Sequence, residues 1–393
     1  MLKTLKIRIY PDEDQKVLIE KHFGSTRFVW NHFLEKRTRE YHDNGKSMSG
    51  FDTINDLKNL KRKYEWLNEA NSQSLQQVLM KLDTSLRSFF KHNTSYPNFR
   101  SKKDNQYFIV PQHFSFGTKG MHLPKFKNMI KFRDKSNVPG HIKQIIVTRD
   151  LDRYYASIQY ELNEDMHTGK GTIGVDMGVK AFITTSDGLQ VEPLNALRKA
   201  EKKLKREQRR LSGKKKGSEN RKKQIVKVQK VHRQIRDART DFNHKVSTAI
   251  AKHYGTVVIE DLNIQGMQRN HHLSKSITDQ GWHQFGRMLE YKLGWRRAEL
   301  ITIGRFNPSS KMCSRCGNIK HDLKLSDRTY HCDICGLGID RDVNAAINIE
   351  RKGMKKLKEI INVGRGTPEF TPVEIGALPA MVTPIAETGS PLR

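Results

Sequence analysis

The chain has 393 residues, of which 36% are hydrophobic and 29% are charged, and its 72 Lys and Arg outnumber its 42 Asp and Glu to give a formal net charge of +30. This length exceeds what one hydrophobic core usually organises, so we expect two or more folded units. Such an excess of positive charge repels itself unless a polyanion neutralises it, which favours nucleic acid over a membrane surface as the partner. No apolar run approaches the ~20 residues of a membrane-spanning helix.

The beginning of the chain predicts a strand followed by helices. Apolar and basic residues alternate over residues 5–9, which is typical of a half-buried strand and not of the apolar core of a signal peptide. Residues 12–92 have helical spacing, with a break expected at Gly24 and Ser25.

The last of these predicted helices has two faces of different chemistry. Its apolar stripe comprises Leu75, Val78, Leu79, Leu82, Leu86 and Phe89. Its opposite face carries Ser72, Gln73, Gln76 and Gln77. This polar face is either solvated or, because Gln can pair with N6 and N7 of adenine, placed to contact base edges.

The segment from about residue 95 to residue 165 has a β-rich pattern in which basic and aromatic side chains interleave. These side chains are Tyr96, Phe99, Arg100, Lys102, Lys103, Tyr107 and Phe108. They suit phosphate contact and stacking on unpaired bases, although the exterior of an ordinary barrel would have the same pattern.

The next segments predict two strands over residues 171–188 and a long helical hairpin over residues 193–252. The second arm of the hairpin has an apolar stripe through Ile225, Val228 and Ile235. Both arms are rich in Lys and Arg, and we expect their charged faces to follow phosphates. A strand, an amphipathic helix and another strand follow, and the Pro-, Thr- and Gly-rich residues 363–393 predict a disordered tail.

The four cysteines form two C-x-x-C pairs, Cys313 with Cys316 and Cys332 with Cys335. Two such pairs suit one tetrahedral zinc ion, and four sulfurs leave no open coordination position, so this zinc would be structural. The paired spacing disfavours a redox role. A disulfide scaffold is not needed, which indicates a cytosolic protein.

Three acids stand in strand or helix contexts that suggest metal binding. Asp176 lies in the apolar strand IGVDMG, Glu260 ends the strand VVIED, and Asp342 precedes the helix of DRDVNAAINI. A charge within or at the end of an apolar strand costs free energy unless it is paired or binds a metal, whereas Asp342 alone would be a helix N-cap. Together, three carboxylates suit Mg²⁺ or Mn²⁺ and phosphodiester hydrolysis, but only a fold can show that they converge.

Five motifs occur in an order that resembles the TnpB proteins of insertion-sequence transposons. They are GVDMGVKAFITTSDG, VVIEDLNIQGM, FNPSSKMCSRCG, CDICG and DRDVNAAINI. GSTRFVWNHFL and YPNFRSKK extend the resemblance into the N-terminal half, so that it spans roughly residues 1–350. The family comprises compact RNA-guided DNA endonucleases related to type V CRISPR effectors.

The resemblance implies an α+β multidomain fold, with a RuvC-like nuclease domain of the RNase H fold and an inserted zinc ribbon. The implied domains are a wedge β-barrel at 1–10 and 95–165, a helical recognition lobe at 11–94, the nuclease at 171–308 and 337–362 with the hairpin 193–252 inserted, the ribbon at 309–336 and the tail at 363–393. Because the ribbon precedes the last helix, the chain that leaves the ribbon enters the helix carrying the third acid.

The resemblance also implies the site residues. Asp176, Glu260 and Asp342 would be the catalytic acids that bind magnesium, with Asp340 as the alternative to Asp342. A transposon-derived guide RNA would pair with target DNA while side chains read a short flanking motif. The positions that match the motif readers are Ser72, Gln73, Gln76 and Gln112, and we expect further nucleic-acid contacts from Arg100, Lys102 and Lys103.

The leading function is therefore magnesium- or manganese-dependent, RNA-guided cleavage of target DNA. We expect it in the cytoplasm of a prokaryote, associated with the nucleoid, with no requirement for a protein oligomer and no membrane partner. The alternative is an RNA-guided or DNA-binding regulator, or a transposition accessory, that does not cleave. An unguided nuclease on the same fold would cut without bound RNA.

Overall fold

The structure is a computed structural model that describes residues 1–45, 47–133, 140–162, 168–271, 273–305, 307–324 and 327–364. The chain divides into two compact units, which confirms that one core does not organise it. Unit 1 comprises residues 1–168, 195–248 and 294–297, and unit 2 comprises residues 169–194, 249–293 and 298–393. Of the predicted tail, residues 365–393 lie outside the described residues.

Unit 1 is built on a seven-stranded sheet in the order β2-β6-β7-β1-β5-β4-β3. Its strands are β1 (Leu2–Tyr10), β2 (Tyr107–Val110), β3 (Ser115–Phe116), β4 (Gly120–His122), β5 (Ile130–Phe132), β6 (His141–Asp150) and β7 (Arg153–Glu161). The first strand lies between β7 and β5 and is antiparallel to both. Ile7 and Ile9 are buried in the sheet's core while Lys6 and Arg8 are exposed, so the predicted alternation is confirmed.

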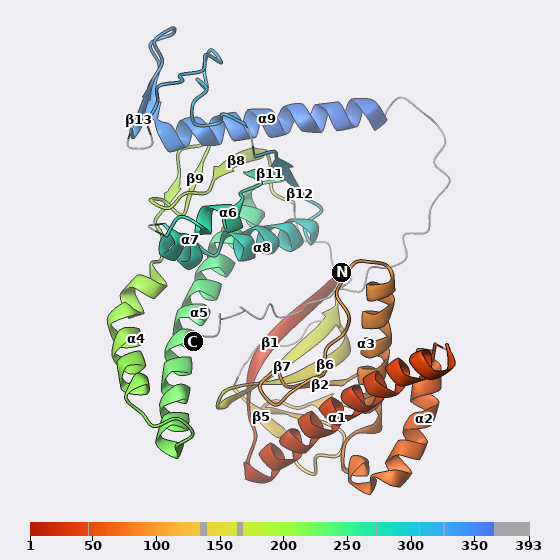
Figure 1. Ribbon diagram of the computed structural model, residues 1–393. Helices are drawn as coiled ribbons and strands as arrows, with labels where there is room; N and C mark the ends of the chain where they lie inside the picture. Colours follow the sequence, from red (N-terminus) through yellow and green to blue (C-terminus); the bar gives the residue numbers. More distant parts are fainter. Residues whose placement is uncertain are drawn as a thin grey trace. The chain divides into compact units, whose positions relative to one another are not determined.

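The helices of unit 1 begin with α1 (Glu13–Asn44), which runs unbroken through Gly24 and Ser25 (Figure 1). The break predicted there is wrong. The residues before Gly24 join the sheet's core and those after Ser25 join a second core formed among the helices. Packing on both sides therefore stabilises a continuous helix and overrides the local preference for a turn.

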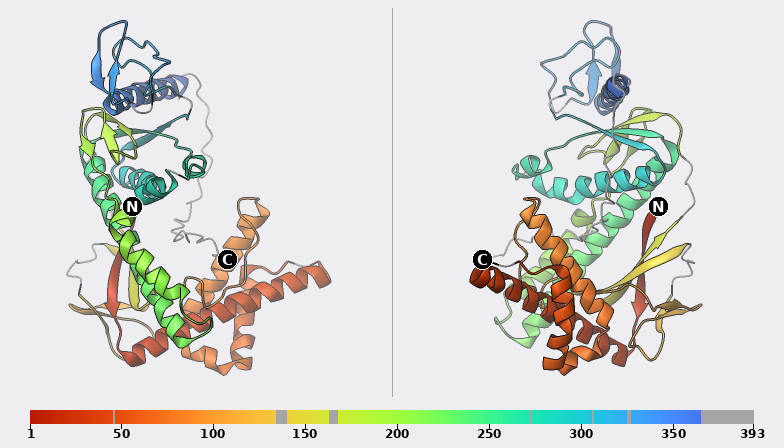
Figure 2. Two further views of the ribbon diagram at one scale, coloured as in Figure 1. Left: turned by 60° about the vertical axis from the view of Figure 1, so that its left-hand side comes forward. Right: turned by 90° about the vertical axis from the view of Figure 1, so that its right-hand side faces the viewer.

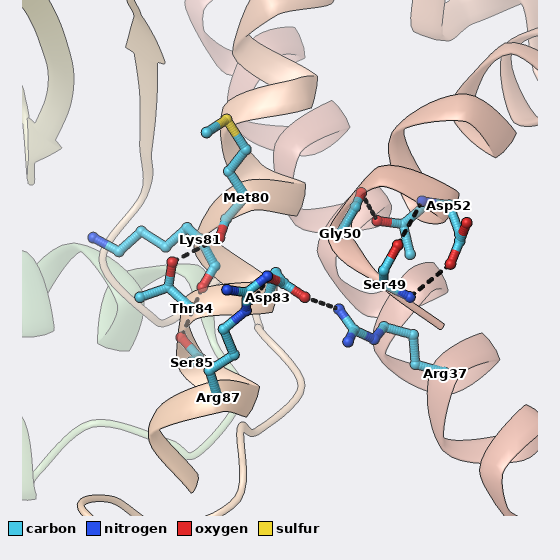
Figure 3. Close-up of polar contacts among 11 residues, drawn as sticks. Arg37, Ser49, Gly50, Asp52, Met80, Lys81, Asp83, Thr84, Ser85 and Arg87 are labelled. Atoms are coloured by element: carbon cyan, nitrogen blue, oxygen red, sulfur yellow. Dashed lines mark hydrogen bonds and ion pairs between the residues drawn. The ribbon is translucent and has the colours of Figure 1, made fainter. Parts of the chain in front are cut away.

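Helices α2 (Gly50–Lys63) and α3 (Ser72–Phe90) complete the second core, together with a 3₁₀ turn at Glu65–Glu69. The predicted stripe of α3 is buried from Leu75 to Leu86. Asp83 lies on the same buried side and pairs with Arg37 of α1 and Arg87 of α3, at 2.9 and 2.7 Å (Figure 3). This carboxylate ties α1 to α3 beside the start of α2.

The predicted helical hairpin consists of α4 (Ala196–Ser212) and α5 (Glu219–His253). Val228 and Ile235 are buried as predicted, but Ile225 is 37% exposed. Gln224 takes the buried position instead, because its amide donates to the Glu207 carboxylate of α4 at 2.8 Å. A polar contact between the arms thus shifts the buried face by one residue.

Part of the hairpin's positive charge is neutralised inside unit 1. Lys230 and Arg233 of α5 both pair with Asp152 at 2.8 Å, and Arg236 pairs with Asp150 at 2.5 Å. Both aspartates lie at the turn between β6 and β7. These side chains anchor the hairpin to the sheet, so only the remaining cations of its surface are available to follow phosphates.

Unit 2 contains a five-stranded sheet in the order β10-β9-β8-β11-β12. Its strands are β8 (Thr172–Asp176), β9 (Ile183–Thr185), β10 (Gln190–Val191), β11 (Thr256–Glu260) and β12 (Glu299–Ile303). Strands β8, β11 and β12 are parallel, and β9 and β10 extend the sheet antiparallel. Parallel strands place their carboxyl ends along one edge, where the side chains of a site can gather.

The helices of unit 2 cover this sheet (Figures 1 and 2). They are α6 (Ile264–Gln268), α7 (Ser274–Gln280), α8 (Trp282–Gly294) and α9 (Arg341–Gly364). A small sheet of β13 (Thr329–His331) and β14 (Gly338–Asp340) immediately precedes α9. Among the described residues, none of the helices is long and apolar enough to cross a membrane.

Candidate active site

Two neighbouring parallel strands end in the first two candidate acids. Val175 of β8 lies opposite Ile259 of β11, so Asp176 and Glu260 follow as the next residue on each strand. Residues that are opposite one another in parallel strands lie on the same face, and neighbouring strands are about 4.8 Å apart. The strand register therefore brings these two carboxylates side by side.

The packing of β11 shows which face the acids occupy. A Cβ on Gly353 of α9 would lie 2.3 Å from Cγ1 of Val258, whereas Ile259 lies 3.9 Å from the corresponding position of Gly286 in α8. Successive side chains of a strand alternate between faces. Glu260, two residues beyond Val258, therefore lies on the α9 face.

The third acid approaches from α9 itself. A Cβ on Gly174 of β8 would lie 2.1 Å from the carbonyl oxygen of Ala346, so strand and helix touch through their backbones. Asp176 lies two residues after Gly174 on the same face of β8, and Asp342 lies one helical turn before Ala346 on the same face of α9. Close backbone contact thus brings Asp342 toward the two strand-end acids.

The pKa of Asp176 is affected by the two other acids. Burial, followed by the negative charges of Glu260 and Asp342, raises the pKa of Asp176 to about 7, while Arg341 and the backbone N–H of Met177 act in the opposite direction. Burial also raises the pKa of Glu260, against a hydrogen bond from Ser309. The negative charges of Glu260 and Asp342 thus disfavour the ionised form of Asp176, and a bound cation would offset that repulsion.

Asp340 has a different role from the three acids. Its Oδ1 accepts hydrogen bonds from the backbone N–H groups of Asp342 (2.9 Å) and Val343 (3.1 Å), which makes it the N-cap of α9. The interpretation of Asp342 as the cap is therefore wrong, because the cap lies two residues earlier. Asp342 lies in the first turn of α9, with its Oδ1 3.4 Å from a guanidinium nitrogen of Arg341.

The four cysteines gather into one cluster, with all four Sγ atoms within 4.8 Å of one another. Sγ of Cys313 lies 3.6 Å from that of Cys335, and Sγ of Cys316 lies 3.5 Å from that of Cys332. Tetrahedral ligation at a metal–sulfur distance of about 2.3 Å separates the sulfurs by roughly 3.8 Å, so the cluster could hold such an ion.

The thiols of this cluster strongly affect one another's ionisation. The backbone N–H of Cys335 is the main cause that lowers the pKa of Cys332 to about 6. At Cys316 the backbone N–H of Asn318 acts in the lowering direction, but burial and the other three sulfurs outweigh it and raise the pKa to about 12. Holding all four sulfurs as thiolates would therefore need a cation, for which the spacing of the cluster is suited.

The carboxylates are less tightly gathered than the sulfurs. Within the described ranges, the four cysteines are the one group of three or more His, Cys, Asp and Glu side chains close enough to hold an ion. The three acids share a corner of the sheet and interact electrostatically without forming such a cluster in this structure.

Sequence reasoning missed the residues that join the cysteine cluster to the acids. Ser309 donates a hydrogen bond to Glu260, and Asn344 and Asn348 of α9 hold the chain around Cys313. The four-residue spacing of the two asparagines places them on one helical face, and this spacing was visible in DRDVNAAINI.

The predicted nucleic-acid contacts all lie in unit 1, but they differ in availability. Ser72, Gln76, Gln112, Lys102 and Lys103 are exposed. The Ser72 hydroxyl accepts a hydrogen bond from Lys61 at 2.7 Å, and Oε1 of Gln73 is buried.

Arg100 is held by its surroundings. Its guanidinium lies 3.5 Å from the ring centre of Trp30 and donates to the Tyr107 hydroxyl at 2.9 Å. Burial lowers its pKa. These contacts give Arg100 a structural role in joining the loop before β2 to α1.

Three segments of the chain match known protein families. Residues 157–271 match the family OrfB_IS605, described as a probable transposase. Residues 282–349 match a Cas12f1-like TNB domain, and residues 1–46 match a helix-turn-helix domain. In this structure residues 1–44 form a strand and one long helix.

Two relatives cover nearly the whole chain. A protein of Streptomyces pristinaespiralis named as an RNA-guided DNA endonuclease is 35% identical over 360 residues, covering 90% of this chain and 89% of its own. InsQ of Escherichia coli strain K12, also named as an RNA-guided DNA endonuclease, is 32% identical over 93% of this chain and 96% of its own. The chain therefore belongs to the TnpB family of RNA-guided DNA endonucleases, which confirms the resemblance drawn from its motifs.

A solved structure shares the fold at much lower identity. The cryo-EM structure of a Cas12f1–sgRNA–target DNA complex matches 89% of this chain and 98% of its own, with a TM-score of 0.58 and 13% identity. This likeness confirms a mixed α and β multidomain architecture.

Proposed function

We propose that the chain is an RNA-guided DNA endonuclease whose unit 2 is a RuvC-like nuclease of the RNase H fold with an inserted zinc ribbon. The observation that carries the proposal is the convergence of Asp176, Glu260 and Asp342 at one corner of the sheet. Family membership supports the guided activity, because relatives that cover 90% and 93% of the chain are named for it.

The donor set of this corner fits magnesium. Its ligand atoms are carboxylate oxygens, which hard divalent cations prefer, and the pKa of Asp176 is raised by burial and by its two acidic neighbours. Mg²⁺ bound there would supply a polarised water and stabilise the charge of a leaving oxygen. Mn²⁺ has the same ligand preference and is the alternative ion.

The chain's own residues prepare this chemistry. The Gly174–Ala346 and Gly353–Val258 contacts hold the three carboxylates on one face. The Ser309 hydroxyl holds one oxygen of Glu260 at 2.6 Å. The cap formed by Asp340 fixes the first turn of α9, which carries Asp342. These contacts would limit how far the three carboxylates move when a metal ion and a scissile phosphate bind, which reduces the reorganisation that catalysis requires.

The four cysteines fit zinc in a structural role. Four thiolates at tetrahedral spacing fill the coordination sphere, so the ion would organise the ribbon and leave hydrolysis to the acids. Strand β13 of this ribbon pairs with β14, which lies directly before α9, so an ordered ribbon would help to position Asp342 at the site.

The proposed partners are a transposon-derived guide RNA and its target DNA. A formal charge of +30 suits two polyanions, and exposed Gln76, Gln112, Lys102 and Lys103 of unit 1 would contact them. Base pairing with the guide would specify the target, while protein side chains would read a short flanking motif.

The experiment begins with the ribonucleoprotein purified with the RNA that accompanies it. Sequencing that RNA identifies the guide, and a matching plasmid then serves as substrate in Mg²⁺. We expect Asp176→Ala to abolish cutting and to retain guide-dependent DNA binding. Glu299→Gln, at the amino end of β12 and away from the acids, is the matched control and should cut normally.

Each of the other outcomes would support a different function. Equal rates for Asp176→Ala and the unsubstituted protein would refute the acidic site. Full target occupancy without strand scission in Mg²⁺ or Mn²⁺ would favour a regulator or transposition accessory. Cutting that continues after RNA removal would indicate an unguided nuclease.

A further inference from the structure

A serine outside the acidic triad contacts one of its members. Ser309 lies in the loop between β12 and the first cysteine pair, and its hydroxyl donates to Oε1 of Glu260 at 2.6 Å. That distance is typical of a charge-assisted hydrogen bond to a carboxylate. The two residues are 49 positions apart in the chain, so their contact depends on how the loop is held.

The loop is held by the helix that carries Asp342. Nδ2 of Asn348 donates to the carbonyl oxygens of Ser309 (2.8 Å) and Met312 (2.6 Å). Ser309 is thus fixed from two directions, through its backbone by α9 and through its hydroxyl by Glu260.

Helix α9 also forms hydrogen bonds to the residues on both sides of Cys313. Nδ2 of Asn344 donates to the carbonyl of Met312 at 2.7 Å, and its Oδ1 accepts from the N–H of Ser314 at 2.9 Å. Met312 and Ser314 flank Cys313. A guanidinium nitrogen of Arg351, one further turn along α9, donates to the carbonyl of Ser314 at 2.5 Å.

The side-chain amides of Asn344 and Asn348 are buried, which restricts their orientation. Asn344 is fully buried and Asn348 is 1% exposed. Oδ1 of Asn348 is buried without a hydrogen-bond partner among the described residues. Turning the amide over would place its oxygen against two carbonyl oxygens, so the observed orientation is held despite the cost of an unsatisfied acceptor.

We propose that this network links the four-cysteine metal site to the acids and that Ser309 is a positioning residue for Glu260. The chain of contacts runs from Cys313 through Asn344 and Asn348 to Ser309 and then to Glu260. It also holds α9, and with it Asp342, against the cysteine cluster. The inference rests on the proposed nuclease function, because it concerns the geometry of the same acids.

The physical effect of the link is preorganisation. With Oε1 held by Ser309, the carboxylate of Glu260 has one orientation, and Oε2 accepts no hydrogen bond from any described residue. Partners of this kind set the direction of a metal-ligating carboxylate, and their loss typically weakens metal affinity or activity about 10- to 100-fold.

The test measures metal binding directly. The guide-bound complex, freed of divalent ions at the acidic site, is titrated with Mn²⁺ and the free ion is followed by EPR. We expect Ser309→Ala to weaken Mn²⁺ binding about 10- to 100-fold and to raise the Mg²⁺ concentration needed for half-maximal cutting in proportion. Ser309→Thr keeps the hydroxyl and should restore most of both.

Ser310→Ala is the matched control, because it removes a neighbouring hydroxyl that makes no hydrogen bond to the described residues. It should bind Mn²⁺ as the unsubstituted chain does. Zinc content and melting temperature, measured for every variant, identify any that fail to fold. Guide RNA affinity should be unchanged throughout.

A double-mutant cycle tests the path from α9. Asn348→Ala should weaken Mn²⁺ binding in the same direction as Ser309→Ala, and the double variant should be no weaker than the more affected single variant. Strictly additive effects would overturn the link, as would a folded Ser309→Ala variant with unchanged Mn²⁺ affinity. If the unsubstituted complex cuts and Ser309→Ala cuts equally at every metal concentration, the link fails and the nuclease function stands. A complex that never cuts refutes the function instead.

Discussion

Gly174 of β8 lies directly against the backbone of Ala346 in α9, with 2.1 Å between the position of an added Cβ and the Ala346 carbonyl oxygen. The amide nitrogen of Glu350 is 2.7 Å from the same position. Both obstacles are backbone atoms, so a side chain at residue 174 can be accommodated only if the helix moves. The distance between β8 and α9 therefore depends on glycine.

Gly174→Ala is expected to lower the free energy of unfolding by about 1–3 kcal/mol, as overpacked cores do, and to reduce cutting because Asp342 moves with α9. Urea unfolding and plasmid cleavage measure the two effects. Gly304→Ala is the control, since an added Cβ there meets nothing within 4 Å. Equal unfolding of the Gly174 variant and the unsubstituted protein would contradict the close approach.

The two aspartates at the start of α9 should respond differently to the same substitution. Asn is as good an N-cap as Asp, so Asp340→Asn should keep α9 intact and retain cutting. Asp342→Asn removes a proposed metal ligand and should lower the cutting rate by at least about 100-fold. Plasmid cleavage at saturating Mg²⁺ measures both, and the reverse ranking would transfer the catalytic role to Asp340.

The pKa of Asp176 predicts a pH dependence of stability in the metal-free protein. Burial, and then the charges of Glu260 and Asp342, raise this pKa from 3.8 to about 7. Between those values the unfolded chain has released the proton and the folded chain has kept it, so the free energy of unfolding falls as pH rises. Above about pH 7 the carboxyl is ionised in both states, so the loss of unfolding free energy is complete and no longer changes with pH.

Asp176→Asn should remove this fall in stability, because the Asn side chain does not ionise. In EDTA the variant should be more stable than the unsubstituted chain at about pH 8, by on the order of 1.4 kcal/mol per unit of pKa shift, and equal to it near pH 4. Added Mg²⁺ should then raise the melting temperature of the unsubstituted chain alone. Identical stabilities of the two proteins in EDTA at about pH 8 would show that folding does not raise the pKa of Asp176.

Local patterns predicted much of this structure because their causes are local. The alternation of residues 5–9 gives β1, and the C-x-x-C spacing gives the cysteine cluster. Their sequence contexts placed Asp176 within a strand and Glu260 at the end of one, whereas each is the last residue of its strand in the structure. Only the register of β8 and β11 shows them to be neighbours.

The remaining features depend on contacts between distant segments. No local pattern indicates that α1 continues through Gly24, because two separate cores stabilise it. The burial of Gln224 in place of Ile225 follows from Glu207 on another helix. The Ser309–Glu260 bond needs α9 to hold the loop, so it emerges only once the helix and sheet are packed.

The Arg37–Asp83–Arg87 contact predicts a large effect from one buried charge (Figure 3). The side chains of Arg37 and Asp83 are only 9% and 13% exposed, so Asp83→Ala leaves a buried guanidinium unpaired and should cost about 3–5 kcal/mol in urea unfolding. Asp83→Asn, which keeps an oxygen acceptor, should cost less. Asp241→Ala breaks the exposed pair with Lys245 and should change stability by no more than about 1 kcal/mol. If both alanine variants unfold alike, Asp83 does not hold α1 to α3.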